Sequence, residues 1–174
     1  MCRKSELYWF YQDGASHIFP DAFDSYRDHI PVSEQSNLID AYYSRLTSDD
    51  VEIQRAAARE WTRWEMATSR LFPDPEYLEK AEDLDFAVAF ARIECHYFIN
   101  AIFVEAYILN HTEKIEHIPT VIVQGRYDVV CPAKSAWELH KALPKSNLII
   151  VPDAGHSMGE VSIARELVIT TDKI

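Results

Sequence analysis

Two short apolar runs in the last third of the chain constrain its fold most. Residues 120–123 read Thr-Val-Ile-Val and residues 147–151 read Asn-Leu-Ile-Ile-Val. Continuous β-branched and aliphatic runs of this length are typical of strands buried on both faces of a parallel sheet. Helix-forming stretches at residues 133–143 and 161–171 alternate with them, which predicts a β-α-β-α segment. Two such strands need neighbours that nothing upstream supplies, so we expect part of a larger sheet, or a chain that pairs with another.

The sequence before Ile118 is helical in character and rich in aromatic residues. The opening, including residues 9–11 and 14–20, is predicted to be irregular, and proline residues interrupt the pattern further on. Ser48 is the predicted N-cap of the longest helix, because acidic residues follow it in the first turn. Apolar spacing predicts helices at residues 23–29, 33–46, 49–69 and 85–109.

Composition excludes several classes of function. A chain of 174 residues with 48% hydrophobic and 12% aromatic residues can bury the core of one ordinary domain. Its net charge of −11, with scattered cations, disfavours nucleic acid and anionic membrane surfaces as partners. Four glycine residues form no phosphate-binding or dinucleotide-binding motif, and the histidine residues show no shared metal spacing. We therefore expect no cofactor and no metal.

The cysteine residues and the start of the chain predict a cytoplasmic protein. Cys2, Cys95 and Cys131 are odd in number and lack metal spacing, which suits free thiols in a reducing compartment. The first residues show no apolar signal core, and no apolar run is long enough to span a bilayer.

Asp128 and His156 are the strongest candidate catalytic residues. Each follows one of the two predicted strands, and in open α/β sheets functional side chains gather at the carboxyl ends of strands. A carboxylate that accepts a hydrogen bond from one imidazole nitrogen leaves the other nitrogen able to take a proton from a nucleophile. The alternative is that Asp128 only closes a turn and His156 is a solvated loop residue.

Ser157 is a possible nucleophile, because residues 155–159 spell G-x-S-x-G. A nucleophile elbow, however, is followed along the chain by its acid and then its histidine, and no histidine follows Ser157. We therefore favour His156 as a base with Ser157 as an incidental neighbour. A thiol nucleophile at Cys131 is a weaker alternative.

Glu65 and Glu94 share predicted helix faces with aromatic residues. Glu65 lies one helical turn after Trp61, and Glu94 lies between Phe90 and Phe98 at i+4 spacing. Carboxylates on such faces are costly unless they are paired. Their partner is an internal cation such as Arg63 or Arg92, a cation of a neighbouring chain, or the ammonium group of a ligand whose apolar part lies on the aromatic wall.

With these residues in view, the sequence closely resembles the C-terminal part of the prolyl iminopeptidases, which are α/β-hydrolases that remove N-terminal proline. The similarity covers essentially the whole chain. The segments that carry it are residues 9–21 (WFYQDGASHIFPD), 45–48 (RLTS), 57–65 (AAREWTRWE), 89–98 (AFARIECHYF), 121–132 (VIVQGRYDVVCP) and 154–157 (AGHS).

The resemblance implies a partial α/β-hydrolase fold, with a mostly helical cap at residues 1–110 and the C-terminal part of the core at residues 111–174. It further implies that Asp128 is the triad acid, that His156 is the base, and that Glu65 and Glu94 bind the amino terminus of a peptide substrate. The family's serine elbow and oxyanion segment precede the cap, so we expect them outside this chain.

Loss of the oxyanion hole alone lowers rates on the order of a hundredfold or more, so the isolated chain is expected to have little activity. It would need the missing N-terminal half, or another chain, to cover its sheet edge. Two other functions stay open: a non-catalytic module that binds a partner by strand addition, and an esterase that uses Ser157.

Overall fold

The computed structural model describes residues 3–103 and 108–172. These residues form two compact units that are described separately below. The helical unit comprises residues 3–68 and 73–103, and the β-α-β-α unit comprises residues 69–72 and 108–172.

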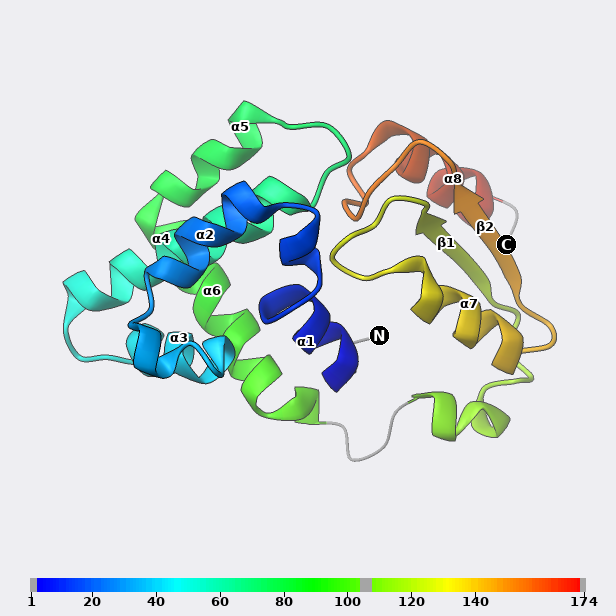
Figure 1. Cartoon of the computed structure of the whole chain (residues 1–174). Helices are drawn as coiled ribbons and strands as arrows, with labels where there is room; N and C mark the ends of the chain where they lie inside the picture. The colour runs from blue at the N-terminus through cyan, green and yellow to red at the C-terminus, as the bar shows by residue number, and fades with distance from the viewer. Residues whose placement is uncertain (1–2, 104–107, 173–174) are drawn as a thin grey trace. The chain divides into compact units, whose positions relative to one another are not determined.

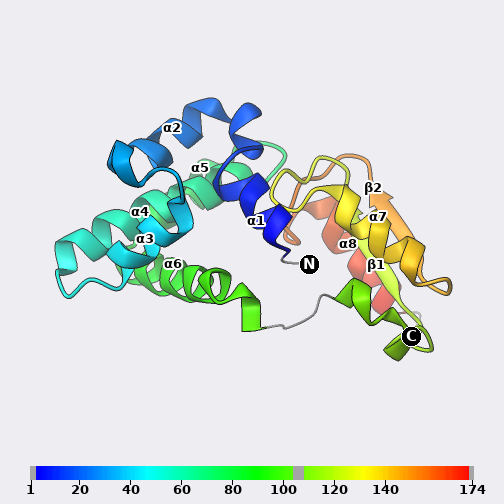
Figure 2. The ribbon, with the colours of Figure 1, turned by 60° about the horizontal axis from the view of Figure 1, so that its bottom comes forward.

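The helical unit is built around one long central helix. Helices α2, α3 and α6 all pack against α4 (Figure 1), and the second view shows α4 and α6 running side by side (Figure 2). The helices of this unit are α1 (Lys4–Tyr11), α2 (Pro20–Asp28), α3 (Leu38–Leu46), α4 (Val51–Thr68), α5 (Pro75–Leu78) and α6 (Leu84–Ile99). Single 3-10 turns at Ala15–His17, Val32–Glu34, Glu79–Glu82 and Ala101–Phe103 complete it.

Aromatic side chains form the core of this unit. The rings of Tyr26 and Tyr42 stack at a centroid distance of 4.5 Å, and those of Tyr11 and Trp61 also stack at 4.5 Å. Trp64 stacks on Phe10 at 5.1 Å. Because aromatic side chains bury large apolar areas, this cluster accounts for much of the hydrophobic stabilisation of the unit.

The predicted helices agree with the structure in position but differ at several ends. Residues 9–11, predicted as irregular, belong to α1, because Glu6 accepts a hydrogen bond from the backbone of Arg3 at 2.7 Å and Phe10 is buried. The predicted N-cap Ser48 is also wrong. Asp50 takes that role, because its carboxylate accepts the backbone N–H groups of Glu52 at 2.9 Å and Ile53 at 3.4 Å.

The helix predicted at residues 85–109 ends at Ile99. Ala101 and Ile102 have φ values of 49° and 62°, and this left-handed backbone cannot continue a right-handed helix. Residues 104–107 of the prediction lie outside the described residues, and Ile108–Asn110 form a 3-10 turn.

The β-α-β-α unit contains two parallel strands and two helices. Strand β1 (Val121–Gly125) pairs with β2 (Asn147–Val151) in the register Val121 to Asn147 through Gly125 to Val151. Helix α7 (Ala133–Ala142) connects the strands, α8 (Val161–Thr171) follows β2, and both helices pack against both strands (Figure 1). A further 3-10 turn at Thr112–Lys114 precedes β1.

A small apolar cluster lies between the strands and α8. It contains Val151, Ala154 and Ile163, with Val123 and Ile149 partly buried against them. Because side chains alternate along a strand, Ile122 and Ile150 point to the opposite face. The strand residues other than Gly125 and Val151 are only partly buried or exposed, although the sequence predicted complete burial.

Candidate active site

The two loops that follow β1 and β2 are joined by backbone hydrogen bonds. The N–H of Arg126 donates to the carbonyl of Val151 at 2.8 Å, and the N–H of Tyr127 donates to that of Ala154 at 3.0 Å. The strands are parallel, so their carboxyl ends meet at one edge, and these bonds extend that pairing into the loops. The loop with Asp128 therefore lies beside the loop with His156.

Two glycine residues permit this close approach. A Cβ atom on Gly125 would collide with the carbonyl oxygen of Gly155. A Cβ atom on Gly155 would lie 2.9 Å from the backbone nitrogen of Leu71. Neither position has room for a side chain, so the histidine loop fits tightly between the end of β1 and residues 70–71.

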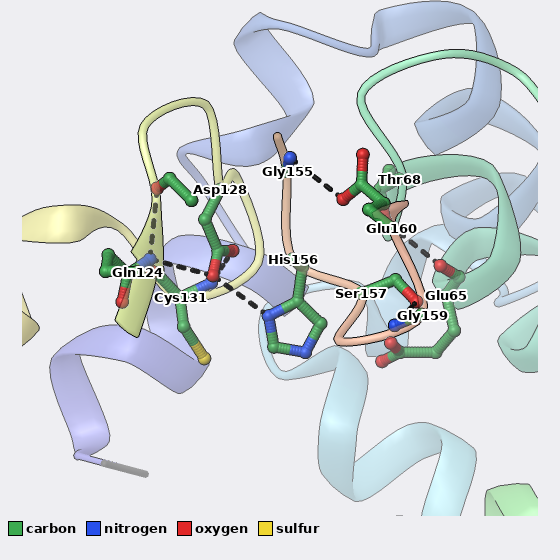
Figure 3. Close-up of polar contacts among 11 residues, drawn as sticks. Glu65, Thr68, Gln124, Asp128, Cys131, Gly155, His156, Ser157, Gly159 and Glu160 are labelled. Atoms are coloured by element: carbon green, nitrogen blue, oxygen red, sulfur yellow. Dashed lines mark hydrogen bonds and ion pairs between the residues drawn. The ribbon is translucent and has the colours of Figure 1, made fainter. Parts of the chain in front are cut away.

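Asp128 and His156 contact each other directly, as shown in Figure 3. His156 Nδ1 lies 3.0 Å from Asp128 Oδ2. An ionised carboxylate only accepts hydrogen bonds, so Nδ1 carries the proton, and neutral His156 can accept a proton at Nε2. The Asp128 side chain is 6% exposed and that of His156 is 38% exposed, which gives a buried acid behind an accessible imidazole.

The Asp128 carboxylate is held by two further donors. The Cys131 backbone N–H donates to Oδ1 at 2.7 Å, which closes the loop, and the Gln124 side-chain amide donates to Oδ2 at 3.0 Å. Gln124 also donates to the carbonyl oxygens of Gly125 and Cys131, both at 3.2 Å. The sequence prediction missed Gln124, although one amide side chain in an otherwise apolar strand was a usable signal.

Ser157 does not have the geometry of a nucleophile elbow. Its hydroxyl accepts the Gly159 N–H at 3.2 Å, and no hydrogen bond joins it to His156 within the described part of the chain. An elbow serine sits on a sharp, strained turn between a strand and a helix. Ser157 is not in the left-handed backbone region and lies inside a longer loop between β2 and α8.

Glu65 and Glu94 lie in the helical unit, on α4 and α6. Tyr11 donates its hydroxyl proton to Glu65, and the Trp61 indole N–H donates to Glu94 at 3.0 Å. Burial raises the pKa of Glu65 well above its ordinary value, and the charge of Glu94 raises that pKa further. The same burial, together with both carboxylates, raises the pKa of Tyr11.

The cations proposed as internal partners do not serve these two glutamates. Arg63 pairs with Glu60 at 3.2 Å and with Glu82. Within residues 3–103 and 108–172, neither Arg63 nor Arg92 forms an ion pair with Glu65 or Glu94. Glu65 is buried and Glu94 is partly buried, and each accepts a hydrogen bond from an aromatic side chain, Tyr11 and Trp61 respectively.

Comparison with known proteins identifies the class. A family model described as the alpha/beta hydrolase fold matches residues 12–162, and the chain belongs to that family. The small parallel sheet within a mostly helical chain is consistent with part of that fold, as the sequence predicted.

The predicted resemblance to prolyl iminopeptidases is confirmed along the whole chain. It is 58% identical to a probable proline iminopeptidase of Leptolyngbya boryana, over 99% of this chain and 54% of the relative. It is 55% identical to a proline iminopeptidase of Arabidopsis thaliana, over 100% of this chain and 47% of the relative. It is 40% identical to a proline iminopeptidase of Neisseria gonorrhoeae, over 100% of this chain and 56% of the relative. The chain spans about half the length of the curated relatives it matches.

No helix among residues 3–103 and 108–172 has the length and apolar character needed to cross a membrane.

Proposed function

We propose that this chain is the C-terminal portion of a serine aminopeptidase that releases N-terminal proline from peptides. The observation that carries the proposal is the 3.0 Å contact between His156 and Asp128 at the ends of adjacent parallel strands. The names of the relatives supply the substrate class. In this proposal residues 1–110 act as a helical cap, and residues 111–174 form the last part of the hydrolase core.

His156 would act as the proton carrier of an acyl transfer. A serine hydroxyl attacks the prolyl carbonyl while Nε2 of His156 accepts its proton, and the same nitrogen then protonates the leaving amine. Water attacks the acyl-enzyme in the second half of the reaction, again with His156 as base. Asp128 holds the required tautomer and stabilises the imidazolium that forms twice in each cycle.

The nucleophilic serine and the oxyanion donors are assigned to a segment outside this chain. The chain spans about half of each relative, and Ser157 lacks elbow geometry. We therefore propose that the isolated chain has little peptidase activity. In this proposal the other half of the enzyme, or another chain, covers the strand edges, and the reaction needs no cofactor.

Glu65 and Glu94 would bind the substrate's amino terminus. An N-terminal prolyl residue carries a secondary ammonium group with two N–H donors beside a flat apolar ring. Two carboxylates can accept those two donors, and the ring can lie on the aromatic side chains around Tyr11 and Trp61. A bound ammonium would also favour the ionised form of Glu65, whose pKa is raised in the free protein.

We further propose a cytoplasmic location. Cys95 and Cys131 form no disulfide bond, which suits a reducing compartment. Cys2 lies outside the described residues.

A chimaeric enzyme tests the proposed function. These 174 residues would replace the matching half of the Leptolyngbya boryana relative, and proline release would be measured from a chromogenic proline amide. We expect the chimaera to release proline and the isolated chain to be nearly inactive. A folded chimaera without activity, beside an active parent enzyme, would refute the assignment.

Variants of the chimaera then test the residue roles. His156→Ala should lower kcat at least about ten-thousandfold, whereas the exposed Glu116→Gln should leave it unchanged. Glu65→Gln and Glu94→Gln should act mainly on KM for proline substrates. Full turnover by His156→Ala would remove this residue as the base.

A further inference from the structure

The loop that carries His156 is fastened to a short segment far away in the sequence. The carbonyl of Ser69 accepts two backbone N–H groups of the loop, from His156 at 3.1 Å and from Ser157 at 2.8 Å. Ser69 directly follows Thr68, the last residue of α4. Within the β-α-β-α unit, residues 69–71 therefore form one wall of the histidine loop.

Glu160 bridges the same two segments with its side chain. Oε1 accepts the backbone N–H of Gly155 at 2.9 Å, as Figure 3 shows, and Oε2 accepts the N–H of Leu71 at 3.1 Å. One carboxylate thus binds the residue just before His156 and the segment opposite. A hydrogen bond that a charged carboxylate accepts is stronger than one between two neutral groups. The two bonds of Glu160 therefore restrain the histidine loop substantially.

The position of Glu160 makes this arrangement unusual. Glu160 is the N-cap residue of α8, where a side chain ordinarily accepts an N–H group of its own first helical turn. Its side chain makes no such capping hydrogen bond. It points instead to the two backbone groups outside the helix, while its negative charge still lies at the favourable end of the helix dipole.

We propose that Glu160 is a positioning residue for His156. We call the clasp the set of hydrogen bonds that the Ser69 carbonyl accepts from His156 and Ser157 and that Glu160 accepts from Gly155 and Leu71. The clasp holds the histidine loop in place, and this keeps Nδ1 of His156 on Asp128. Because the imidazole must reach the nucleophile as well, a loose loop would lower the rate of proton transfer without weakening substrate binding. The inference rests on the proposed function of His156 as base, but its structural part can be tested without activity.

The first test measures the clasp itself. In the 174-residue chain, amide hydrogen exchange at Gly155, His156 and Leu71 would be followed by NMR, together with the imidazole ¹⁵N shifts that report the tautomer. Glu160→Gln keeps the size of the side chain but has only one acceptor oxygen, so exchange should become about tenfold faster and the Nδ1–H tautomer less populated. Glu116→Gln is the matched control and should match the unmodified chain.

Glu160→Asp separates the clasp from a simple effect of charge. Aspartate keeps the charge and is a good N-cap, but its shorter side chain cannot reach both N–H groups. The clasp predicts that Glu160→Asp behaves like Glu160→Gln. If amide exchange in Glu160→Asp equals that of the unmodified chain, only the charge at the start of α8 matters. That result would overturn the proposal.

The second test measures the catalytic consequence. In the chimaeric enzyme both Glu160 variants should lower kcat about tenfold while KM stays unchanged, and the pH profile should shift because His156 is held less firmly by Asp128. The positioning role would be refuted if amide hydrogen exchange in the Glu160 variants matched that of the unmodified chain. It would also be refuted if these variants changed KM about tenfold and left kcat unchanged. Failure of His156→Ala to affect proline release would instead refute the proposed function and leave the exchange result intact.

Discussion

The helical unit and the β-α-β-α unit differ in how completely each buries its own apolar side chains. The helical unit encloses Tyr26, Tyr42 and Trp61, each with no exposed surface, in one continuous aromatic cluster. In the other unit, five hydrophobic residues among those described are buried: Ala136, Leu143, Val151, Ala154 and Ile163. The helical unit has its own core, whereas most side chains of strands β1 and β2 are only partly buried or are exposed.

This difference also separates two ways of building a site. In the helical unit Glu65 is buried beside aromatic rings, and burial is the main cause of its raised pKa. The β-α-β-α unit makes its His-Asp pair from loops joined by backbone hydrogen bonds and by two glycine residues. Side-chain packing supports the first site and backbone fit supports the second, and the following predictions test this contrast.

The largest expected effect on stability is the loss of a core aromatic residue. Trp64 is 1% exposed, so Trp64→Ala should lower the free energy of unfolding of the helical unit by about 3–5 kcal/mol in urea titrations. Trp64→Phe should cost much less, because the indole nitrogen has no hydrogen-bond partner within the described part of the chain.

Ile163→Ala is the matched change in the other unit and should cost only about 2 kcal/mol, because its neighbours Val123 and Ile149 are partly exposed. Equal losses for Trp64→Ala and Ile163→Ala would break the comparison between the units.

The next effect is a pH dependence that belongs to the helical unit. The pKa of Glu65 is raised in the folded state, so protonation of its side chain stabilises the fold. This stabilisation is fully present below the pKa of the unfolded chain, about 4.3. As the pH rises from that value to the pKa of Glu65 in the folded state, the free energy of unfolding should therefore fall by about 1.4 kcal/mol per pH unit.

Glu65→Gln should remove this slope, because the amide is always neutral and its oxygen still accepts the hydrogen bond of Tyr11. Urea titrations from about pH 5 to pH 8 would measure it. A slope that persists unchanged in Glu65→Gln would assign the pH dependence to another group.

A smaller effect tests the backbone fit of the loops that carry Asp128 and His156. Gly125→Ala should cost about 1–3 kcal/mol and weaken the contact between His156 and Asp128, because the added methyl group displaces the carbonyl of Gly155. Gly159→Ala is the control, since its Cβ would meet other atoms only at 3.5 Å or more, and it should change stability by less than about 0.5 kcal/mol. Thermal unfolding and the His156 imidazole shifts would report both, and equal behaviour of the two variants would contradict a tight fit at Gly125.

The smallest effect compares one thiol in each unit. Burial raises the pKa of Cys95 to about 12, whereas Cys131 is only partly buried. Iodoacetamide at about pH 8 should modify Cys131 and spare Cys95 until denaturant is added, as peptide mass spectrometry would show. Modification of Cys95 at the same rate in the native protein would mean that the helical core opens readily.

The sequence predicted the strands well because their patterns are local. Continuous β-branched residues gave β2 at residues 147–151 with correct ends, and α8 at residues 161–171 was equally clear. Residues 9–11 were missed as helix, since their burial depends on aromatic partners distant in sequence. The end of α6 was missed because the backbone turns left-handed at Ala101 without a glycine or proline as a signal.

The candidate site was predicted only in part for the same reason. Asp128 and His156 each follow a strand, so their proximity could be inferred from the geometry of parallel sheets. Glu160 gave no signal, because its hydrogen bond from Leu71 joins segments that are far apart along the chain. The pairing of Arg63 with Glu82 likewise depends on how α4 packs against the turn at Glu79–Glu82.

By itself the sequence determined the β-α-β-α order of the last third, the two loops that carry Asp128 and His156, and the family to which the chain belongs. These features depend on residues close together in the chain, or on motifs that can be matched directly. The tertiary structure decided which nitrogen of His156 faces Asp128, how Glu65 acquires a raised pKa, and what holds the histidine loop. Each of these depends on hydrogen bonds and burial between distant residues, which only the folded chain brings together.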